Sequence, residues 1–233
     1  MGQIGERIAV IRDRIEEICR QCSRNPSDVR VIGASKGHDR NAVEEAFREG
    51  ITDFGENYVQ EARAKFSSPH PAWSVHYIGH LQRRKVKSVP GLFDVVQTID
   101  ASETILALSR VMEGRSTPFS VCIEVTYSSS PDRPGTSPEG VRTLLNDILL
   151  CPSLSCRGFM LVASTTDRTT ARKEFAALRE MRESMEHEFG ALLPELSMGM
   201  SGDYDLAIAE GATMVRLGTA LFGPRLPLST GMH

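Results

Sequence analysis

Eight short apolar runs alternate with stretches of helical pattern along this chain, and this alternation limits its possible folds more than any other feature. Parallel strands must be joined by a crossover, which is usually a helix. Eight such repeats favour a closed parallel barrel, an α/β fold of the (β/α)8 TIM type, over the alternative of an open, doubly wound sheet. The predicted strands are Val29–Ala34, Thr52–Phe54, Val75–Ile78, Val95–Ile99, Phe119–Val125, Gly158–Val162, Leu196–Met200 and Thr213–Leu217.

The pattern also predicts an extra N-terminal helix before the first strand. Its apolar stripe consists of isoleucines at steps of four and three residues, namely Ile4, Ile8, Ile11, Ile15 and Ile18. The other predicted helices are Asn41–Glu49, Tyr58–Phe66, Glu103–Met112, Gly140–Leu149, Thr170–Phe189 and Tyr204–Ala209. Because no strong linker divides the chain, we expect one domain over residues 1–233, with a frayed tail at 226–233 that has nothing to bury.

The charge balance argues against two classes of partner. The chain has 27 Lys and Arg against 30 Asp and Glu, a formal net charge of -3. Nucleic acids and membrane surfaces both select a basic face, so we expect neither as a partner. No apolar run approaches the roughly 20 residues that a bilayer requires, and the first residues do not resemble a secretory signal. We therefore expect a cytoplasmic protein.

The five cysteines are typical of reduced thiols. They are odd in number and have no repeating spacing. Cys19 and Cys22 form a CxxC element, but it lies on a predicted helix, and no second Cys/His pair stands at the spacing of zinc ligands. We expect neither a metal site nor redox chemistry.

Lys36 closes the otherwise apolar first strand. A lysine at this place either extends to solvent or points over the mouth of the barrel. In the second case, desolvation lowers its pKa and frees the amine to form an imine with a carbonyl compound. The lysine alone does not decide between these two interpretations.

Two further segments near the end of the chain favour a phosphorylated ligand. Met200 ends the seventh predicted strand. Ser201 follows it, where the N-cap of the next helix is expected, a position suited to phosphate. The other interpretation is an ordinary cap beside a core pair of methionines. In the eighth strand Arg216 interrupts an apolar run, and Gly218 and Thr219 follow it. A buried guanidinium needs an acceptor, supplied either by a neighbouring carboxylate or by a ligand.

Three more residues lie at the ends of neighbouring strands. Asn57 follows the second strand, and it either binds a ring substituent or caps the next helix. His76 lies on the third strand and Gly79 at its exit. His76 is either a core histidine with satisfied hydrogen bonds or a ligand contact. The irregular stretch 128–138 follows the fifth strand, where barrels place active-site loops, so it is a candidate lid as well as an ordinary surface loop.

Several long motifs, in order, resemble those of the pyridoxal phosphate homeostasis protein family, stand-alone relatives of the N-terminal barrel of alanine racemase. These motifs are Ala-Ser-Lys (34–36), Phe-Gly-Glu-Asn-Tyr-Val-Gln-Glu (54–61), His-Tyr-Ile-Gly-His-Leu-Gln (76–82), Ser-Met-Gly-Met-Ser (197–201) and Val-Arg-Leu-Gly-Thr-Ala-Leu-Phe-Gly (215–223). The resemblance spans nearly the whole chain. It implies pyridoxal 5′-phosphate (PLP) as the cofactor.

The resemblance also implies roles for individual residues. Lys36 would hold PLP as a Schiff base, Arg216 would face the pyridine nitrogen, and Asn57 would lie beside the ring. The phosphate would be bound by Ser201, Gly218 and Thr219. His76, Gly79 and Met200 complete the candidate cofactor-binding residues.

Three departures from the family pattern are visible. One is the strand segment Phe159-Met-Leu-Val-Ala, which replaces a more usual Leu- and Met-rich strand. Gly37 follows Lys36, where a threonine or similar residue is expected. Arg133 stands in the 128–138 loop where relatives often have a lysine, and an arginine cannot form a Schiff base. This last departure puts in doubt any transfer role for a second lysine in that loop.

Three functions are compatible with this set of residues. The family implies a non-catalytic PLP-binding protein that takes part in intracellular PLP homeostasis and delivers the cofactor, with PLP-dependent apo-enzymes as partners. A PLP-dependent amino-acid racemase is the alternative, but it needs a second acid/base group, and we expect the barrel to use up the chain. A cofactor-free aldolase using Lys36 rests on the lysine alone. The sequence contains no heptad repeat that would form a coiled-coil interface with another subunit, so we expect a monomer.

Overall fold

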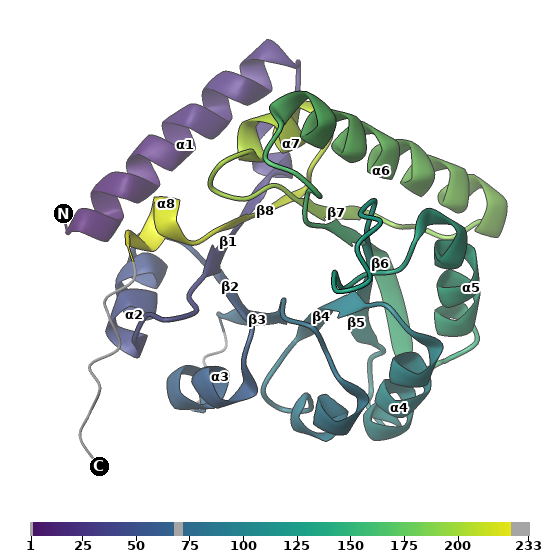
Figure 1. Ribbon diagram of the computed structural model, residues 1–233. Helices are drawn as coiled ribbons and strands as arrows, with labels where there is room; N and C mark the ends of the chain where they lie inside the picture. Colours follow the sequence, from purple (N-terminus) through teal and green to yellow (C-terminus); the bar gives the residue numbers. More distant parts are fainter. Residues whose placement is uncertain (1, 68–71, 225–233) are drawn as a thin grey trace.

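The computed structural model describes residues 2–67 and 72–224. Eight parallel strands close into a barrel in the order β1 to β8 (Figure 1). This confirms the (β/α)8 barrel and excludes the open sheet. The strands are β1 (Arg30–Ala34), β2 (Asp53–Glu56), β3 (Ser74–Tyr77), β4 (Val95–Ile99), β5 (Phe119–Val125), β6 (Leu154–Leu161), β7 (Glu195–Met198) and β8 (Met214–Leu217). The prediction of a frayed tail at 226–233 lies outside the described residues.

Helices surround the barrel and connect its strands (Figure 1). A 3-10 helix, η2 (Arg83–Ser88), takes the place of an α-helix between β3 and β4. A second one, η1 (Pro26–Asp28), precedes β1. The α-helices are α1 (Gln3–Gln21), α2 (Arg40–Arg48), α3 (Val59–Phe66), α4 (Ser102–Met112), α5 (Pro138–Leu149), α6 (Arg168–Phe189), α7 (Tyr204–Ala209) and α8 (Thr219–Phe222).

The extra N-terminal helix is present. The five isoleucines of α1 are buried, and the helix packs outside the barrel against α2, α7 and α8 (Figure 1). Burial of this apolar stripe is what attaches α1 to the barrel, because roughly 25 cal/mol is gained per Å² of apolar surface removed from water.

Most strands begin or end one or more residues away from the predicted bounds, and two of the larger differences have identifiable reasons. The sixth strand begins at Leu154 rather than Gly158, because Leu154 and Cys156 face the core while polar residues alternate with them. This period of two is the signature of a strand with one accessible face. The seventh strand ends at Met198 rather than Met200, because Gly199 leaves the extended conformation with a φ of 92°.

The pairing of β1 sets the place of the candidate site. Closure of the barrel pairs β1 with β8, with Ile32 opposite Arg216, and with β2, where Ala34 lies opposite Gly55. Since β7 pairs with β8, the carboxyl ends of β7, β8, β1 and β2 are neighbours on one face. Active sites of such barrels are built from the loops on this face.

The described part of the chain was searched for disulfides, metal sites and membrane-spanning helices. All five cysteines are free. Within residues 2–67 and 72–224, no group of three or more His, Cys, Asp or Glu side chains is arranged to hold a metal ion. No helix within the same residues is long and apolar enough to cross a membrane.

Candidate functional site

Lys36 lies in the turn that follows β1, at the carboxyl-terminal face of the barrel. Its side chain is half-buried and lines a groove of about 1380 Å³ that also involves Arg40, Tyr58 and Phe222. Gly37 has a φ of 76°, the left-handed region that favours glycine. The local backbone therefore explains why this chain has glycine after Lys36, where a β-branched residue would be strained.

Arg216 is buried inside the barrel and held by oxygen acceptors. Its Nη1 donates to the main-chain oxygen of Ser197 at 2.7 Å and to the Ser197 Oγ at 2.8 Å, and its Nη2 donates to the oxygen of Leu161 at 2.9 Å. Burial lowers the pKa of Arg216 to about 10, which leaves the guanidinium charged at neutral pH. These bonds use the two Nη groups, and the Nε–H is the guanidinium donor that they leave over.

Ser201 meets the start of α8, and this differs from its expected place. Sequence reasoning placed Ser201 at the N-cap of α7, which is wrong: the N-cap is Asp203, whose Oδ1 accepts from the main-chain N–H of Met200 at 2.6 Å. The Oγ of Ser201 instead accepts from the N–H of Ala220 at 3.2 Å. Gly218 is the N-cap of α8 and Thr219 its first residue, so Ser201, Gly218 and Thr219 are brought together.

The two methionines of this segment have different environments. Met198 is fully buried, whereas Met200 is 39% exposed. Met200 therefore does not belong to a core pair, and it lies in the same turn as Ser201. It stays a predicted contact of the cofactor.

Asn57 lies just beyond β2, and Gly79 packs directly against it. A Cβ on Gly79 would lie 2.8 Å from the Asn57 Cα and closer still to the Asn57 main-chain oxygen. Only glycine therefore allows these two main-chain segments to approach so closely. The Oδ1 of Asn57 is buried without a hydrogen-bond partner among the described residues. Buried oxygens are nearly always paired, so this atom is a candidate acceptor for a donor on a ligand.

His76 belongs to a buried hydrogen-bond chain inside the barrel. Its Nε2 lies 3.1 Å from Asp53 Oδ1 and its Nδ1 2.8 Å from Gln97 Nε2. The chain continues from Ser197 Oγ to Gln97 Oε1 at 2.7 Å and reaches Arg216 through Ser197. His76 thus has the satisfied hydrogen bonds of a core histidine and is connected to Arg216 through two intervening side chains.

Glu124 is a buried acid that sequence reasoning missed. It lies on β5 and is 5% exposed, and its Oε2 has no hydrogen-bond partner among the described residues. Burial raises the pKa of Glu124 to about 7, with Asp100 adding to the effect and Arg216 opposing it. The signal was available, because Glu124 interrupts an apolar strand just as Arg216 does.

The loop between β5 and α5 is attached to the end of β6 by Arg133. The guanidinium donates to the main-chain oxygens of Ser164 at 2.8 Å and Val162 at 3.2 Å, and also to that of Ala163. Leu161, the preceding residue, supplies the oxygen that binds Arg216. The loop is therefore held beside the candidate site. Whether it acts as a lid stays a prediction.

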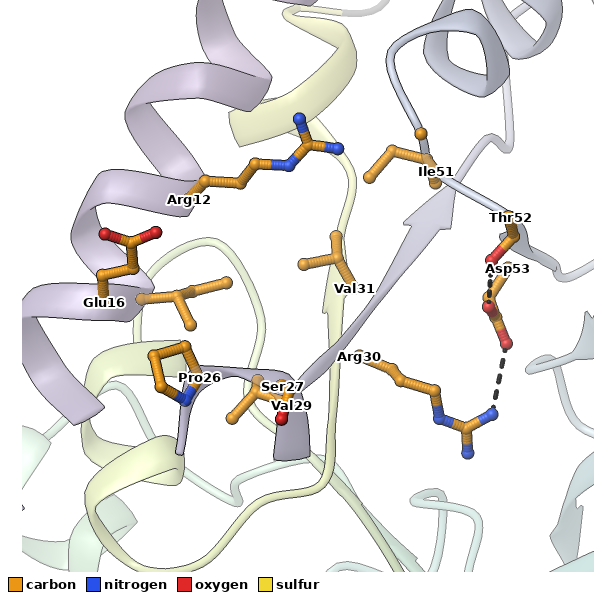
Figure 2. A pocket seen from close by; sticks show the side chains of 12 residues that line it. Arg12, Glu16, Pro26, Ser27, Val29, Arg30, Val31, Ile51, Thr52 and Asp53 are labelled. Carbon is orange, nitrogen blue, oxygen red and sulfur yellow. Dashed lines mark hydrogen bonds and ion pairs between the residues drawn. The ribbon is translucent and has the colours of Figure 1, made fainter. Parts of the chain in front are cut away.

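A separate pocket lies at the opposite end of the barrel. It has a volume of about 380 Å³ and is formed by α1 and the amino-terminal ends of β1 and β2 (Figure 2). The carboxylate of Asp53 in this pocket already has partners within the protein, since it accepts hydrogen bonds from Thr52 at 2.8 Å and from Arg30 at 3.4 Å. Catalytic and cofactor sites of such barrels lie on the other face, so we do not assign the ligand to this pocket.

Comparison with known proteins identifies the family. The profile of the alanine racemase N-terminal domain matches residues 7–226. The pyridoxal phosphate homeostasis protein of Pseudomonas aeruginosa is 37% identical over 229 residues, which cover 97% of this chain and 97% of that protein. The chain belongs to the pyridoxal phosphate homeostasis protein family. The member from Schizosaccharomyces pombe is 32% identical and covers 97% of this chain and 94% of its own.

Solved structures agree with this assignment. PipY from Synechococcus elongatus, a structure with PLP bound, is 33% identical, has a TM-score of 0.82 and covers 95% of this chain and 100% of its own. Alanine racemase from Bacillus anthracis is 20% identical with a TM-score of 0.66, and the match covers 94% of this chain and 56% of the racemase. The racemase shares the fold alone.

Proposed function

We propose that this chain binds PLP as a Schiff base on Lys36 and serves PLP homeostasis without catalysing a reaction of its own. The observation that supports the proposal is that β7, β8 and β1 are neighbours in the barrel, with Lys36 following β1, Arg216 on β8 and Ser201 following β7. The family's name and the PLP-bound PipY structure support the choice of ligand.

The described residues fit the chemical groups of PLP. Lys36 supplies a primary amine; the nitrogen bonds to the aldehyde carbon, and one water is lost. Ser201 and the first amides of α8, at Gly218 and Thr219, face the place for the phosphate, since a helix N-terminus attracts anions. The unpartnered Oδ1 of Asn57 is suited to a ring hydroxyl.

The identity of the residue at the ring nitrogen favours storage over catalysis. PLP-dependent reactions use the ring as an electron sink, which a protonated ring nitrogen strengthens. We infer that Arg216 faces this nitrogen with its Nε–H. A permanently charged guanidinium there disfavours ring protonation, so the bound cofactor activates substrates weakly.

The other candidate residues act around this core in the proposal. His76 supports Arg216 through Gln97 and Ser197, Gly79 fixes the position of Asn57, and Met200 covers the phosphate side. The protein is then a cytoplasmic monomer that delivers PLP to apo-enzymes.

The proposal is tested by titrating the purified protein with PLP while recording its absorption spectrum. We expect a yellow band that saturates at one PLP per chain and is absent in Lys36→Ala. A protein that takes up no PLP in excess ligand contradicts the proposal.

The racemase alternative is tested by incubating the loaded protein with L-alanine and measuring D-alanine. Sustained turnover that disappears in Lys36→Ala would replace the carrier function by racemisation. We expect no turnover above that of free PLP.

A further inference from the structure

Lys65 is a buried lysine directly beneath the turn that contains Lys36. It lies on α3 and is 5% exposed. Its Nζ donates to the main-chain oxygen of Ser35 at 2.6 Å and to Glu56 Oε1 at 2.6 Å. The Ser35 Oγ donates to the same Glu56 oxygen at 2.5 Å. Two side chains, those of Lys65 and Glu56, therefore hold Ser35, the residue that immediately precedes Lys36.

Glu61 holds the residue on the other side. Its Oε2 accepts from the main-chain N–H of Gly37 at 2.8 Å, and it also lies 3.5 Å from Lys65 Nζ. Glu61 and Lys65 are one turn apart on α3, so one helix contacts both neighbours of Lys36. The turn lies between β1 and α2. Its main chain is also held by hydrogen bonds from the Ser35 N–H to the Gly55 oxygen at 3.1 Å and from the His38 N–H to the Ser35 oxygen at 3.0 Å.

The cost of burying these charges points to a role beyond packing. Glu56 has no exposed surface, and burial raises its pKa although the ammonium of Lys65 opposes the effect. A buried ion pair is often no more stabilising than apolar residues of the same volume. Unlike apolar residues, this ion pair can bind the main chain of Ser35 in a fixed geometry, because the ammonium of Lys65 is a charged hydrogen-bond donor.

We propose that Lys65, Glu56 and Glu61 are positioning residues that clamp the main chain on both sides of Lys36 and hold its amine where the bond to PLP forms. The inference rests on the proposed function of Lys36. We expect the clamp to act on the covalent step, because Lys65 and Glu61 bind the main chain of Ser35 and Gly37, the two neighbours of Lys36. The residues proposed for phosphate and ring binding lie elsewhere, on β8 or just after β2, β7 and β8.

The test compares two ligands that differ only at the reacting carbon. PLP forms a bond to Lys36, whereas pyridoxamine 5′-phosphate has an amine in place of the aldehyde and binds through ring and phosphate alone. Dissociation constants of both are measured by equilibrium dialysis for the wild type and for Lys65→Met, which removes the ammonium and keeps the length of the side chain. Lys173→Met, an exposed lysine on α6, is the control.

We expect Lys65→Met to weaken PLP binding about tenfold, the factor that corresponds to one hydrogen bond to a charged group. Binding of pyridoxamine 5′-phosphate stays within about twofold of the wild type by the same reasoning. Equal losses for the two ligands, or no loss for PLP, overturn the clamp. A wild type that binds neither ligand overturns the proposed function itself.

Glu61 gives a second variant that does not depend on the buried pair. Its side chain is 36% exposed, so Glu61→Ala folds even where Lys65→Met does not. We expect Glu61→Ala to weaken PLP binding several-fold with pyridoxamine 5′-phosphate unaffected. Glu61→Gln keeps an oxygen for the Gly37 N–H and restores PLP binding, whereas Glu103→Ala on α4 changes nothing. An unchanged PLP affinity in Glu61→Ala, or no recovery in Glu61→Gln, contradicts the clamp.

Discussion

The Nη1 of Arg216 lies 2.8 Å from the Oγ of Ser197 inside the barrel. The same hydroxyl donates to Gln97 Oε1 at 2.7 Å, so Ser197 joins the arginine to the buried polar residues of β4 and β3. A buried chain of this kind is favourable only while every member has its partner. The orientation of Arg216 therefore depends on Ser197 and, through it, on Gln97 and His76.

Replacing Ser197 by alanine should break this chain at one point. Gln97 Oε1 loses its donor in a buried place, so we expect the free energy of unfolding to fall by about 1–3 kcal/mol. We expect weaker PLP binding as well, since Arg216 loses one of its acceptors. Urea denaturation and PLP titration measure the two effects. Ser102→Ala, which removes a bond to Asp147 outside the barrel, is the control; a stable Ser197→Ala with unchanged PLP affinity would refute the dependence.

Gly79→Ala tests the close approach to Asn57. The new Cβ would lie 2.8 Å from the Asn57 Cα, and a main-chain atom cannot move aside as a flexible side chain can. We expect a loss of about 1–3 kcal/mol in stability together with weaker PLP binding. Gly202→Ala, where a Cβ meets open space, should retain wild-type stability. Equal thermal stability of the two variants would show that the contact is not restrictive.

The fold was largely predictable from the sequence because its strongest signals are local. The isoleucine stripe of α1 and the apolar run of β5 each carry their own period, and β5 occupies the predicted residues. The β6 boundary was missed because an alternating strand has a weaker signal than a continuous apolar run. The turn at Gly199 depends on a backbone conformation that composition does not report.

The candidate site was predictable only in part, for a related reason. Arg216 was recognised as a charge within an apolar strand, whereas Glu124 has the same signal and was overlooked. Lys65 gives no such signal, because a lysine near the end of a polar helix normally faces solvent. Its burial depends on how α3 packs beside the turn after β1, which is a tertiary relationship. The bonds of His76 to Asp53 and Gln97 likewise depend on the register of three strands.

Glu124 predicts a pH dependence of stability. Its pKa rises from its usual value of about 4.5 to about 7 on folding, so the native state binds the proton more tightly than the unfolded chain. The resulting stabilisation is complete below pH 4.5 and is lost as the pH rises through 7. We expect Glu124→Gln to be more stable than the wild type at pH 8 by roughly 2–3 kcal/mol, and the difference to shrink toward pH 5. Urea denaturation at both pH values measures it, with exposed Glu103→Gln as the control; a pH-independent difference would contradict the assignment.

We predict that the hydrogen bonds of Arg133 keep the loop between β5 and α5 closed. The guanidinium binds main-chain oxygens of three consecutive residues after β6. Without it, the loop should open more often and be cleaved several-fold faster by subtilisin, because local opening exposes the chain to protease. Arg142→Ala, an exposed arginine on α5, should be cleaved at the wild-type rate. Equal rates for Arg133→Ala and the wild type would mean that other contacts hold the loop.

The attachment of PLP to Lys36 is tested most directly by borohydride reduction of the PLP-loaded protein, followed by peptide mass spectrometry. Reduction converts a Schiff base into a stable secondary amine, so the modified lysine can be identified. We predict that the peptide containing Lys36 carries the mass of a reduced pyridoxyl phosphate group, and that Lys36→Ala carries none. A modification confined to another lysine, or no modification of any peptide, would contradict the proposed attachment.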